Sequence, residues 1–260
     1  MSKLPVFVSN CGACQDGTSF PVSISMAFQP IVDVEAGRVF AYEALVRGEN
    51  GEPAGWVLDQ VQSETLYAFD QLCRVKAIEQ ASRLKLADTG ARLSINFFPG
   101  AVYSAEACLR LTLSTADALG FPKDRLIFEI TENERVRDRK HIQSIVAAYR
   151  KHGFLMALDD FGAGYSGFNL LADLSADLVK LDMDLVRNID TRPAARSIVR
   201  SLQLLCWELG LQLIAEGVET VEEYRTLREC GVSLIQGYLL ARPAFEALPE
   251  FTLPQLGVAL

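Results

Sequence analysis

Histidine is scarce in this sequence. Only His141 and His152 occur, and both lie in or just after one predicted helical stretch. Six cysteines are present, but only Cys11 and Cys14 are close together, in a CGAC spacing that fits half of a zinc site or a redox pair. Because no second pair of ligands lies nearby, we interpret residues 1–20 as an N-terminal tail that carries a CxxC motif. A redox or metal-dependent regulatory role for the two cysteines stays open.

Long apolar runs are also absent. No stretch approaches 18 consecutive apolar residues, so the sequence contains no candidate transmembrane helix. The apolar piece LPVFV near the N-terminus is too short for the core of a secretory signal. We therefore expect a cytoplasmic protein with no membrane partner, in which the cysteines are mostly reduced.

Positive charge is in deficit. The chain has 25 lysines and arginines against 33 aspartates and glutamates, so its formal net charge is −8 and its pI is about 4.9. No basic stripe that could neutralise phosphates is visible, and we expect no duplex nucleic acid partner. An acidic protein can still bind a small phosphate compound where metal ions intervene.

Apolar segments and helical patterns alternate along the rest of the chain. With 260 residues, 50% of them hydrophobic, the chain can bury a sizeable core. We find no linker and no internal repeat, and we predict one domain over residues 21–260. The predicted strands are 24–34, 39–47, 92–97, 125–131, 154–159, 177–182, 211–216 and 233–237, and the predicted helical stretches are 57–86, 104–119, 135–152, 166–174, 193–209 and 220–230.

Eight strands with helices between them over about 250 residues are typical of a (β/α)8 barrel of the TIM type. The first two strands are joined only by residues 35–38, whereas a parallel crossover needs a dozen or more residues. We therefore predict an α/β barrel whose first strand runs antiparallel to the second. An open, doubly wound sheet is the alternative.

Polar residues interrupt the apolar pattern in the second half of nearly every predicted strand. In a barrel of mostly parallel strands these halves meet at one mouth, where such folds build active sites. A single acid at a strand end is more often a cap or a surface residue, so the prediction depends on recurrence over most of the strands. The interrupting residues are Glu43, Asn96, Glu129, Glu132, Asp159, Asp160, Lys180, Glu216, Glu219 and Gln236.

Carboxylates gathered in this way cannot all be charged unless cations neutralise them. Oxygen ligands without cysteine or histidine suit Mg²⁺ or Mn²⁺. The predicted strand FLMALD ends on Asp159, and its neighbour Asp160 follows directly, just before the glycine-spaced loop GAGYSG. If the chain turns there, the two acids can reach different metal ions. Two ions about 3.5–4 Å apart form the clamp used in phosphoryl hydrolysis.

Eight motifs occur in order along the chain, namely FQPIVD (28–33), AYEALVR (41–47), SINF (94–97), FEITE (128–132), DDFGAGYSG (159–167), VKLD (179–182), AEGVET (215–220) and QGYLLARP (236–243). Together they resemble the motifs of the EAL-domain family, bacterial phosphodiesterases for the second messenger cyclic di-GMP. The resemblance covers residues 26 to about 250. The loop departs mildly from the family's usual DDFGTGYSS, because Ala163 and Gly167 stand in it.

The resemblance implies hydrolysis of one phosphodiester bond of cyclic di-GMP to linear pGpG, with two ions of Mg²⁺ or Mn²⁺ in each site. It also implies a (β/α)8 barrel with an antiparallel first strand. The implied metal ligands are Glu43, Asn96, Glu129 and Asp159 for one ion, and Asp159, Asp160 and Glu216 for the other.

The resemblance also implies the remaining roles. The implied catalytic residues are Lys180 at the attacking water, Glu216 as metal ligand or base, and Glu219 and Gln236 in support of the second ion. The implied substrate-binding residues are Gln29, Leu45 and Arg47, and the implied anchor of the loop after Asp160 is Glu132.

Two other functions stay open from the sequence. One is a catalytically inactive receptor that binds cyclic di-GMP or a partner protein, and the other is a metal-dependent phosphodiesterase for a different nucleotide. Every implied ligand position carries suitable chemistry, which favours the cyclic di-GMP enzyme. By analogy with the family we also expect a homodimer.

Overall fold

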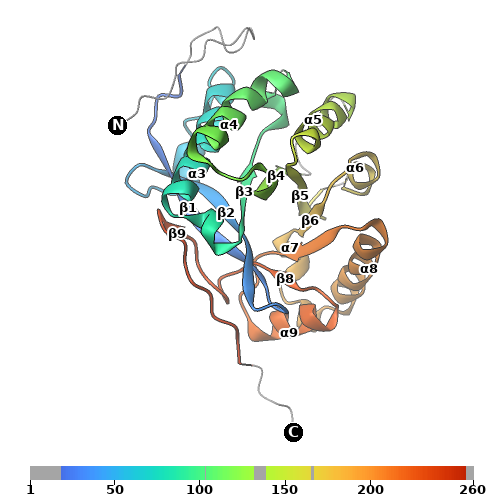
Figure 1. Cartoon of the computed structure of the whole chain (residues 1–260). Helices are drawn as coiled ribbons and strands as arrows, with labels where there is room; N and C mark the ends of the chain where they lie inside the picture. Colours follow the sequence, from blue (N-terminus) through green and yellow to red (C-terminus); the bar gives the residue numbers. More distant parts are fainter. Residues whose placement is uncertain (1–18, 103, 132–138, 165–166, 256–260) are drawn as a thin grey trace.

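A computed structural model describes residues 19–102, 104–131, 139–164 and 167–255 of the chain. Most of the predicted tail, including Cys11 and Cys14, lies outside these residues. The described strands form one sheet that closes on itself, with helices around its outer side (Figure 1). They are β1 (Ile24–Asp33), β2 (Arg38–Gly48), β3 (Arg92–Asn96), β4 (Leu126–Thr131), β5 (Leu155–Phe161), β6 (Leu178–Leu181), β7 (Gln212–Ala215), β8 (Leu234–Ile235) and β9 (Ala244–Phe245).

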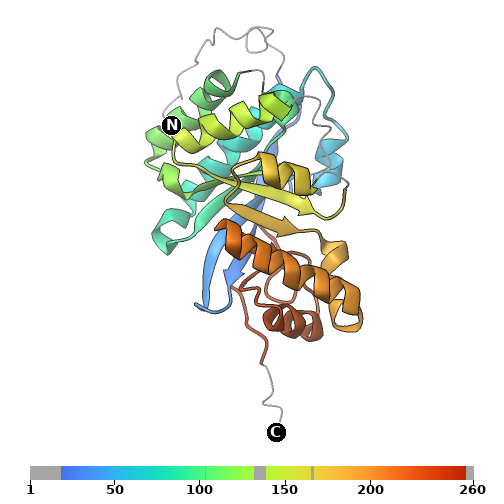
Figure 2. The same ribbon diagram turned by 90° about the vertical axis from the view of Figure 1, so that its right-hand side faces the viewer.

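The helices cover the barrel in two groups. In both views α3, α4 and α5 lie along one part of the wall, and α8 and α9 lie together along another (Figures 1 and 2). No helix in the described ranges is both long enough and apolar enough to cross a membrane. The α-helices are α2 (Ala54–Leu58), α3 (Leu66–Arg83), α4 (Ala105–Leu119), α5 (Arg139–Lys151), α6 (Gly167–Asp173), α7 (Met183–Val186), α8 (Pro193–Leu209) and α9 (Val221–Glu229).

The strand order confirms the predicted barrel. Strands β2 to β8 follow one another around the sheet, and each pairs in parallel with the next. Strand β1 closes the ring by pairing antiparallel with both β2 and β8. A short turn reverses the chain after β1. There the Asp33 carboxylate accepts hydrogen bonds from the backbone N–H groups of Glu35 and Ala36, and Gly37 takes a φ of +63°.

Two expectations about the elements were wrong. The predicted helical stretch 57–86 is two helices, α2 and α3, separated by a turn in which the Gln62 backbone N–H donates to the Thr65 hydroxyl at 3.0 Å. The eighth strand is shorter than predicted, and the sequence did not suggest β9. Because β8 covers only one end of the free edge of β1, β9 pairs with Ala27 and Phe28 farther along that edge.

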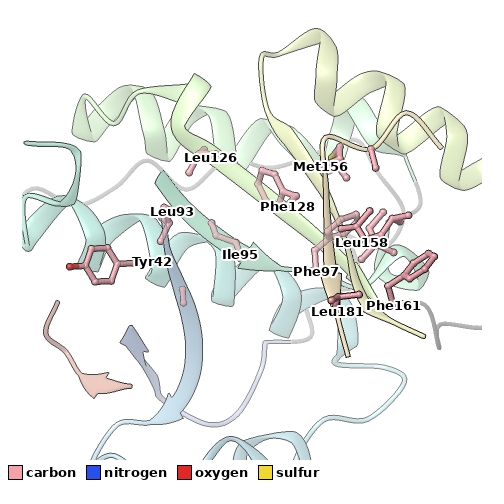
Figure 3. Close-up of a cluster of buried hydrophobic side chains, with 14 of the residues drawn as sticks. Tyr42, Leu93, Ile95, Phe97, Leu126, Phe128, Met156, Leu158, Phe161 and Leu181 are labelled. Atoms are coloured by element: carbon pink, nitrogen blue, oxygen red, sulfur yellow. The ribbon is translucent and has the colours of Figure 1, made fainter. Parts of the chain in front are cut away.

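The outer and inner faces of the strands belong to two separate clusters of buried apolar side chains. Outward-facing residues pack under the helices in one large apolar cluster, which includes Leu93, Phe128 and Leu181 (Figure 3). Inward-facing residues fill the lower part of the barrel. Full burial of a large apolar side chain contributes about 1.5–3 kcal/mol, so both layers stabilise the wall. The inner apolar layer comprises Ile31, Ala41, Ile127, Ala157, Leu178, Ile214 and Leu234.

A glycine allows two loops to touch at the mouth. A Cβ atom on Gly237 would lie 2.0 Å from the carbonyl oxygen of Val218, far inside contact distance. We expect Gly237→Ala to lower the free energy of unfolding by about 1–3 kcal/mol, the usual cost of overpacking. Gly55→Ala, in open space on α2, is the matched control and should melt at or above the wild-type temperature. Equal melting temperatures for the G237A chain and the wild type would contradict this contact.

Candidate active site

A polar layer lies directly above the inner apolar layer. Side chains two residues apart on a strand point to the same face. The residue two positions after each inward-facing apolar residue therefore also points into the barrel. Ala41 leads to Glu43 and Leu178 leads to Lys180 in this way. On the reversed strand β1 the order is inverted, and Gln29 precedes Ile31. The residues of this polar layer are Gln29, Glu43, Ser94, Asn96, Glu129, Asp159, Lys180, Glu216 and Gln236.

Lys180 lies at the centre of the layer and is 1% exposed. Its Nζ lies 2.6 Å from Glu216 Oε1, 2.7 Å from Glu129 Oε2, 3.1 Å from Asp159 Oδ1 and 3.5 Å from Glu43 Oε2. Burial alone would lower the pKa of Lys180, but the four carboxylates raise it well above its usual value. Lys180 is therefore a fixed positive charge shared by carboxylates on β2, β4 and β5 and by Glu216, which directly follows β7.

Neutral donors hold two of these carboxylates. Asn96 Nδ2 donates to Glu43 Oε1 at 2.9 Å, and Gln236 Nε2 donates to Glu43 Oε2 at 2.8 Å. Burial would raise the pKa of Glu43, but Lys180 and these two amides hold it below its usual value. Ser94 Oγ donates to Glu129 Oε1 at 2.5 Å.

A bulge explains how two adjacent acids serve one site. The pairing of β5 with β6 shifts register between Leu158 and Phe161, and Asp160 takes a φ of +53°. A non-glycine residue rarely adopts this left-handed conformation, and it is retained at functional sites at a cost of about 1–3 kcal/mol. The shift brings Asp160 toward the same mouth as Asp159. Carboxylate oxygens of Asp159, Asp160 and Glu216 all lie within 4.8 Å of one another.

Negative charge exceeds positive charge in this cluster. Burial, with repulsion from Glu43 and Asp159, raises the pKa of Glu129 to about 8 despite Lys180. Burial and the neighbouring Asp159 raise the pKa of Asp160 to about 6. Burial also raises the pKa of Glu216 well above its usual value. At neutral pH such a cluster must take up protons or bind cations.

The donor set fits a hard divalent cation. Asp159 Oδ1 and Glu216 Oε1 are buried and accept no hydrogen bond among the described residues, although Lys180 lies near both. With Glu43, Glu129 and Asp160 they make five carboxylates around one lysine. Carboxylate and amide oxygens are the preferred ligands of Mg²⁺, Mn²⁺ and Ca²⁺. Two divalent ions would balance the four negative charges left after Lys180 is counted.

A cavity of about 340 Å³ opens above the carboxylates. Gln29, Leu45 and Glu219, all predicted site residues, line it together with Tyr238 and with four of the carboxylates. Beside it lies an apolar cavity of about 240 Å³ that shares Leu45.

Other predicted residues lie apart from this cavity or outside the described chain. Arg47 does not line the cavity, and its Nη1 donates to the carbonyl of Val46 at 2.7 Å. Glu132 lies outside the described residues, so its predicted role as a loop anchor stays a prediction. Glu219 lines the cavity, but among the described residues no ion pair joins it to Lys180. Its two oxygens instead pair with Arg187 Nη1 and Nη2, both at 3.0 Å.

The sequence did not single out Ser94, Arg187 or Tyr238. Ser94 follows the same two-residue period as Asn96, and that period was the available signal. Arg187 and Tyr238 lie outside the strands, where periodicity gives no direction for a side chain.

A family model and several known proteins match most of this chain. The family model described as "EAL domain" matches residues 22–243. Among curated relatives, the blue light- and temperature-regulated antirepressor BluF of Escherichia coli is 28% identical over 88% of this chain. The cyclic di-GMP phosphodiesterase PA2567 of Pseudomonas aeruginosa is 29% identical over 86% of it. The chain spans only 56% and 38% of these two relatives.

Solved structures resemble the whole barrel. A standalone versatile EAL protein from Vibrio cholerae with c-di-GMP bound has a TM-score of 0.86 and 47% identity, over 90% of this chain and 98% of that one. Klebsiella pneumoniae BlrP1 in a manganese/cy-diGMP complex has a TM-score of 0.84 and 33% identity, over 89% of this chain and 58% of that one.

Proposed function

Since the chain belongs to the EAL-domain family, we propose that it hydrolyses one phosphodiester bond of cyclic di-GMP and releases linear pGpG. The observation that carries this proposal is the excess of carboxylates around Lys180 at the mouth of the barrel. Relatives named as phosphodiesterases and structures holding cyclic di-GMP support it.

Two divalent cations, Mg²⁺ or Mn²⁺, form part of the proposal. Bound there, they would activate a water molecule and stabilise negative charge on the phosphoryl oxygens. Glu43, Asn96, Glu129 and Asp159 would hold one ion, and Asp159, Asp160 and Glu216 the other. A structure of BlrP1 with manganese supports a divalent requirement in the family.

The chain's own residues would then act on the substrate. Lys180 would supply a buried positive charge near the attacking water. Glu216, whose Oε1 lies 2.6 Å from Lys180 Nζ, is the proposed group to take the proton of the water. Gln236 would keep Glu43 aligned through their hydrogen bond, and Glu219 would act from the rim.

Substrate binding would use the rim of the cavity. Gln29 and Leu45 line it, and Arg47 offers a planar fork for a phosphate once its side chain leaves the Val46 carbonyl. The apolar cavity beside Leu45 suits a flat base. A cytoplasmic location and a homodimer are further parts of this proposal, taken from the sequence and the family.

Turnover of cyclic di-GMP tests the proposal directly. We expect chromatography to show pGpG with Mg²⁺ or Mn²⁺ and none with excess EDTA, because the site needs cations to neutralise its carboxylates. Restoring the cation after chelation should restore turnover, which controls for damage to the protein. If the chain binds cyclic di-GMP but produces no pGpG with either cation, it is a receptor, the alternative function.

A further inference from the structure

Ser94 is the one hydroxyl in the polar layer among the described residues. It lies on β3, is fully buried, and its Oγ donates to Glu129 Oε1 at 2.5 Å. None of the proposed ligand or catalytic roles uses it. A buried hydroxyl aimed at a metal-site carboxylate calls for a reason, because an alanine would pack there without a polar group to satisfy.

The two oxygens of Glu129 have donors on opposite sides. Ser94 serves Oε1, and Lys180 Nζ serves Oε2 at 2.7 Å. The terminal torsion of a glutamate is broad, so its own rotamer preference does not set the plane of the carboxylate. The two donors set that plane. Without Ser94, Lys180 alone would hold the Glu129 carboxylate and would draw it toward the centre of the polar layer.

Strand β3 supplies a neutral donor to each neighbouring strand. Asn96 Nδ2 reaches Glu43 on β2, and Ser94 Oγ reaches Glu129 on β4. The two donors are two residues apart and share the inner face. Neither adds charge, so both orient a carboxylate without weakening its attraction for a cation.

We infer that Ser94 is a positioning residue that holds the Glu129 carboxylate in the orientation a divalent cation needs. This inference rests on the proposed function, because Glu129 is a metal ligand only under that proposal. Residues that orient a metal ligand through a hydrogen bond typically change metal affinity about 10–100-fold when they are replaced.

The test measures Mn²⁺ binding by calorimetry on the full chain, without cyclic di-GMP. We expect Ser94→Ala to weaken Mn²⁺ binding about 10–100-fold and to reduce the rise in melting temperature that Mn²⁺ causes. Ser94→Thr, which keeps the hydroxyl, should bind Mn²⁺ more tightly than the alanine variant. Melting in EDTA shows whether each variant is folded.

Ser25→Ala is the matched control. Ser25 is also a buried strand serine, and its Oγ donates to a carboxylate, Glu246 Oε1, at 2.6 Å. This variant removes the same kind of hydrogen bond away from the acidic cluster, so it should lose stability and keep wild-type Mn²⁺ affinity. Wild-type Mn²⁺ affinity in a folded Ser94→Ala chain overturns the inference.

Failure of the proposed function has a different signature. If the wild-type chain binds Mn²⁺ but does not hydrolyse cyclic di-GMP, the proposed activity is wrong. The effect of Ser94→Ala on Mn²⁺ affinity can still be measured, so the inference about Ser94 is tested independently. A wild-type chain that binds no Mn²⁺ overturns the inference, whereas turnover of cyclic di-GMP with Mg²⁺ or Mn²⁺ decides the proposed function separately.

Discussion

Replacing Asp159 with asparagine is expected to lower turnover of cyclic di-GMP at least about 1,000-fold. Asp159 lies 3.1 Å from Lys180 and within 4.8 Å of both Asp160 and Glu216, so it belongs to both proposed ligand sets. An amide of the same shape removes one negative charge from the cations. Metal ions contribute several kcal/mol to stabilising the transition state, and about 4 kcal/mol corresponds to a factor near 1,000.

The same variant should not unfold the protein. The carboxylates of the empty site repel one another, so Asp159→Asn should melt at or above the wild-type temperature in EDTA. Asp33→Asn is the matched control, because Asp33 caps the turn after β1 and asparagine can accept the same backbone hydrogen bonds. It should keep wild-type turnover. More than one tenth of wild-type turnover in a folded D159N chain would argue against the metal assignment.

Replacing Arg74 with methionine is expected to lower the free energy of unfolding by about 3–5 kcal/mol, the usual cost of breaking a buried ion pair. Arg74 is fully buried, with Nη2 2.7 Å from Asp70 Oδ2 and Nη1 2.5 Å from the Tyr149 hydroxyl. Its guanidinium also lies 5.1 Å from the centre of the Phe97 ring. Methionine fills part of the volume but leaves the Asp70 carboxylate buried without its cation.

Chemical denaturation measures this loss, with Arg83→Met as the control. Arg83 pairs with Glu246 at 3.1 Å, but its side chain is 58% exposed, so its removal should cost less than about 1 kcal/mol. Adding Asp70→Asn to the Arg74→Met chain should recover part of the stability, because the unpaired charge disappears. Equal losses for the two arginine variants would show that Arg74 contributes no more than a surface residue.

Much of the barrel could be predicted because its strands repeat one rule. Ala41 with Glu43, and Leu178 with Lys180, place an apolar and then a polar residue on one face, and the rule needs no tertiary information. Strand β9 could not be predicted, because two residues form a strand only where an unpaired edge meets them. The break between α2 and α3 depends on a local turn at Thr65 that apolar spacing does not report.

The acids of the site could be predicted because a charge inside an apolar strand demands a reason. The position of Ser94 in the site could not be predicted, because a serine in a strand is ordinary and only its hydrogen bond to Glu129 makes it significant. The burial of Arg74 could not be predicted for a related reason. An arginine four residues after an aspartate on a helix is typical of an exposed pair, and only tertiary packing against Phe97, Phe128 and Tyr149 buries it.

The reversal of β1 also bears on how the chain is made. Strands β1 and β2 can form their hairpin soon after they leave the ribosome, but the other edge of β1 waits for β8 and β9. The ring therefore stays open until residue 235 has been synthesised, and part of the edge of β1 stays unpaired until residue 245 follows. Until then the nascent chain presents an unpaired strand edge, the kind of surface that aggregates and that chaperones shield. Closure comes late, and it completes the ring of mutually repelling carboxylates.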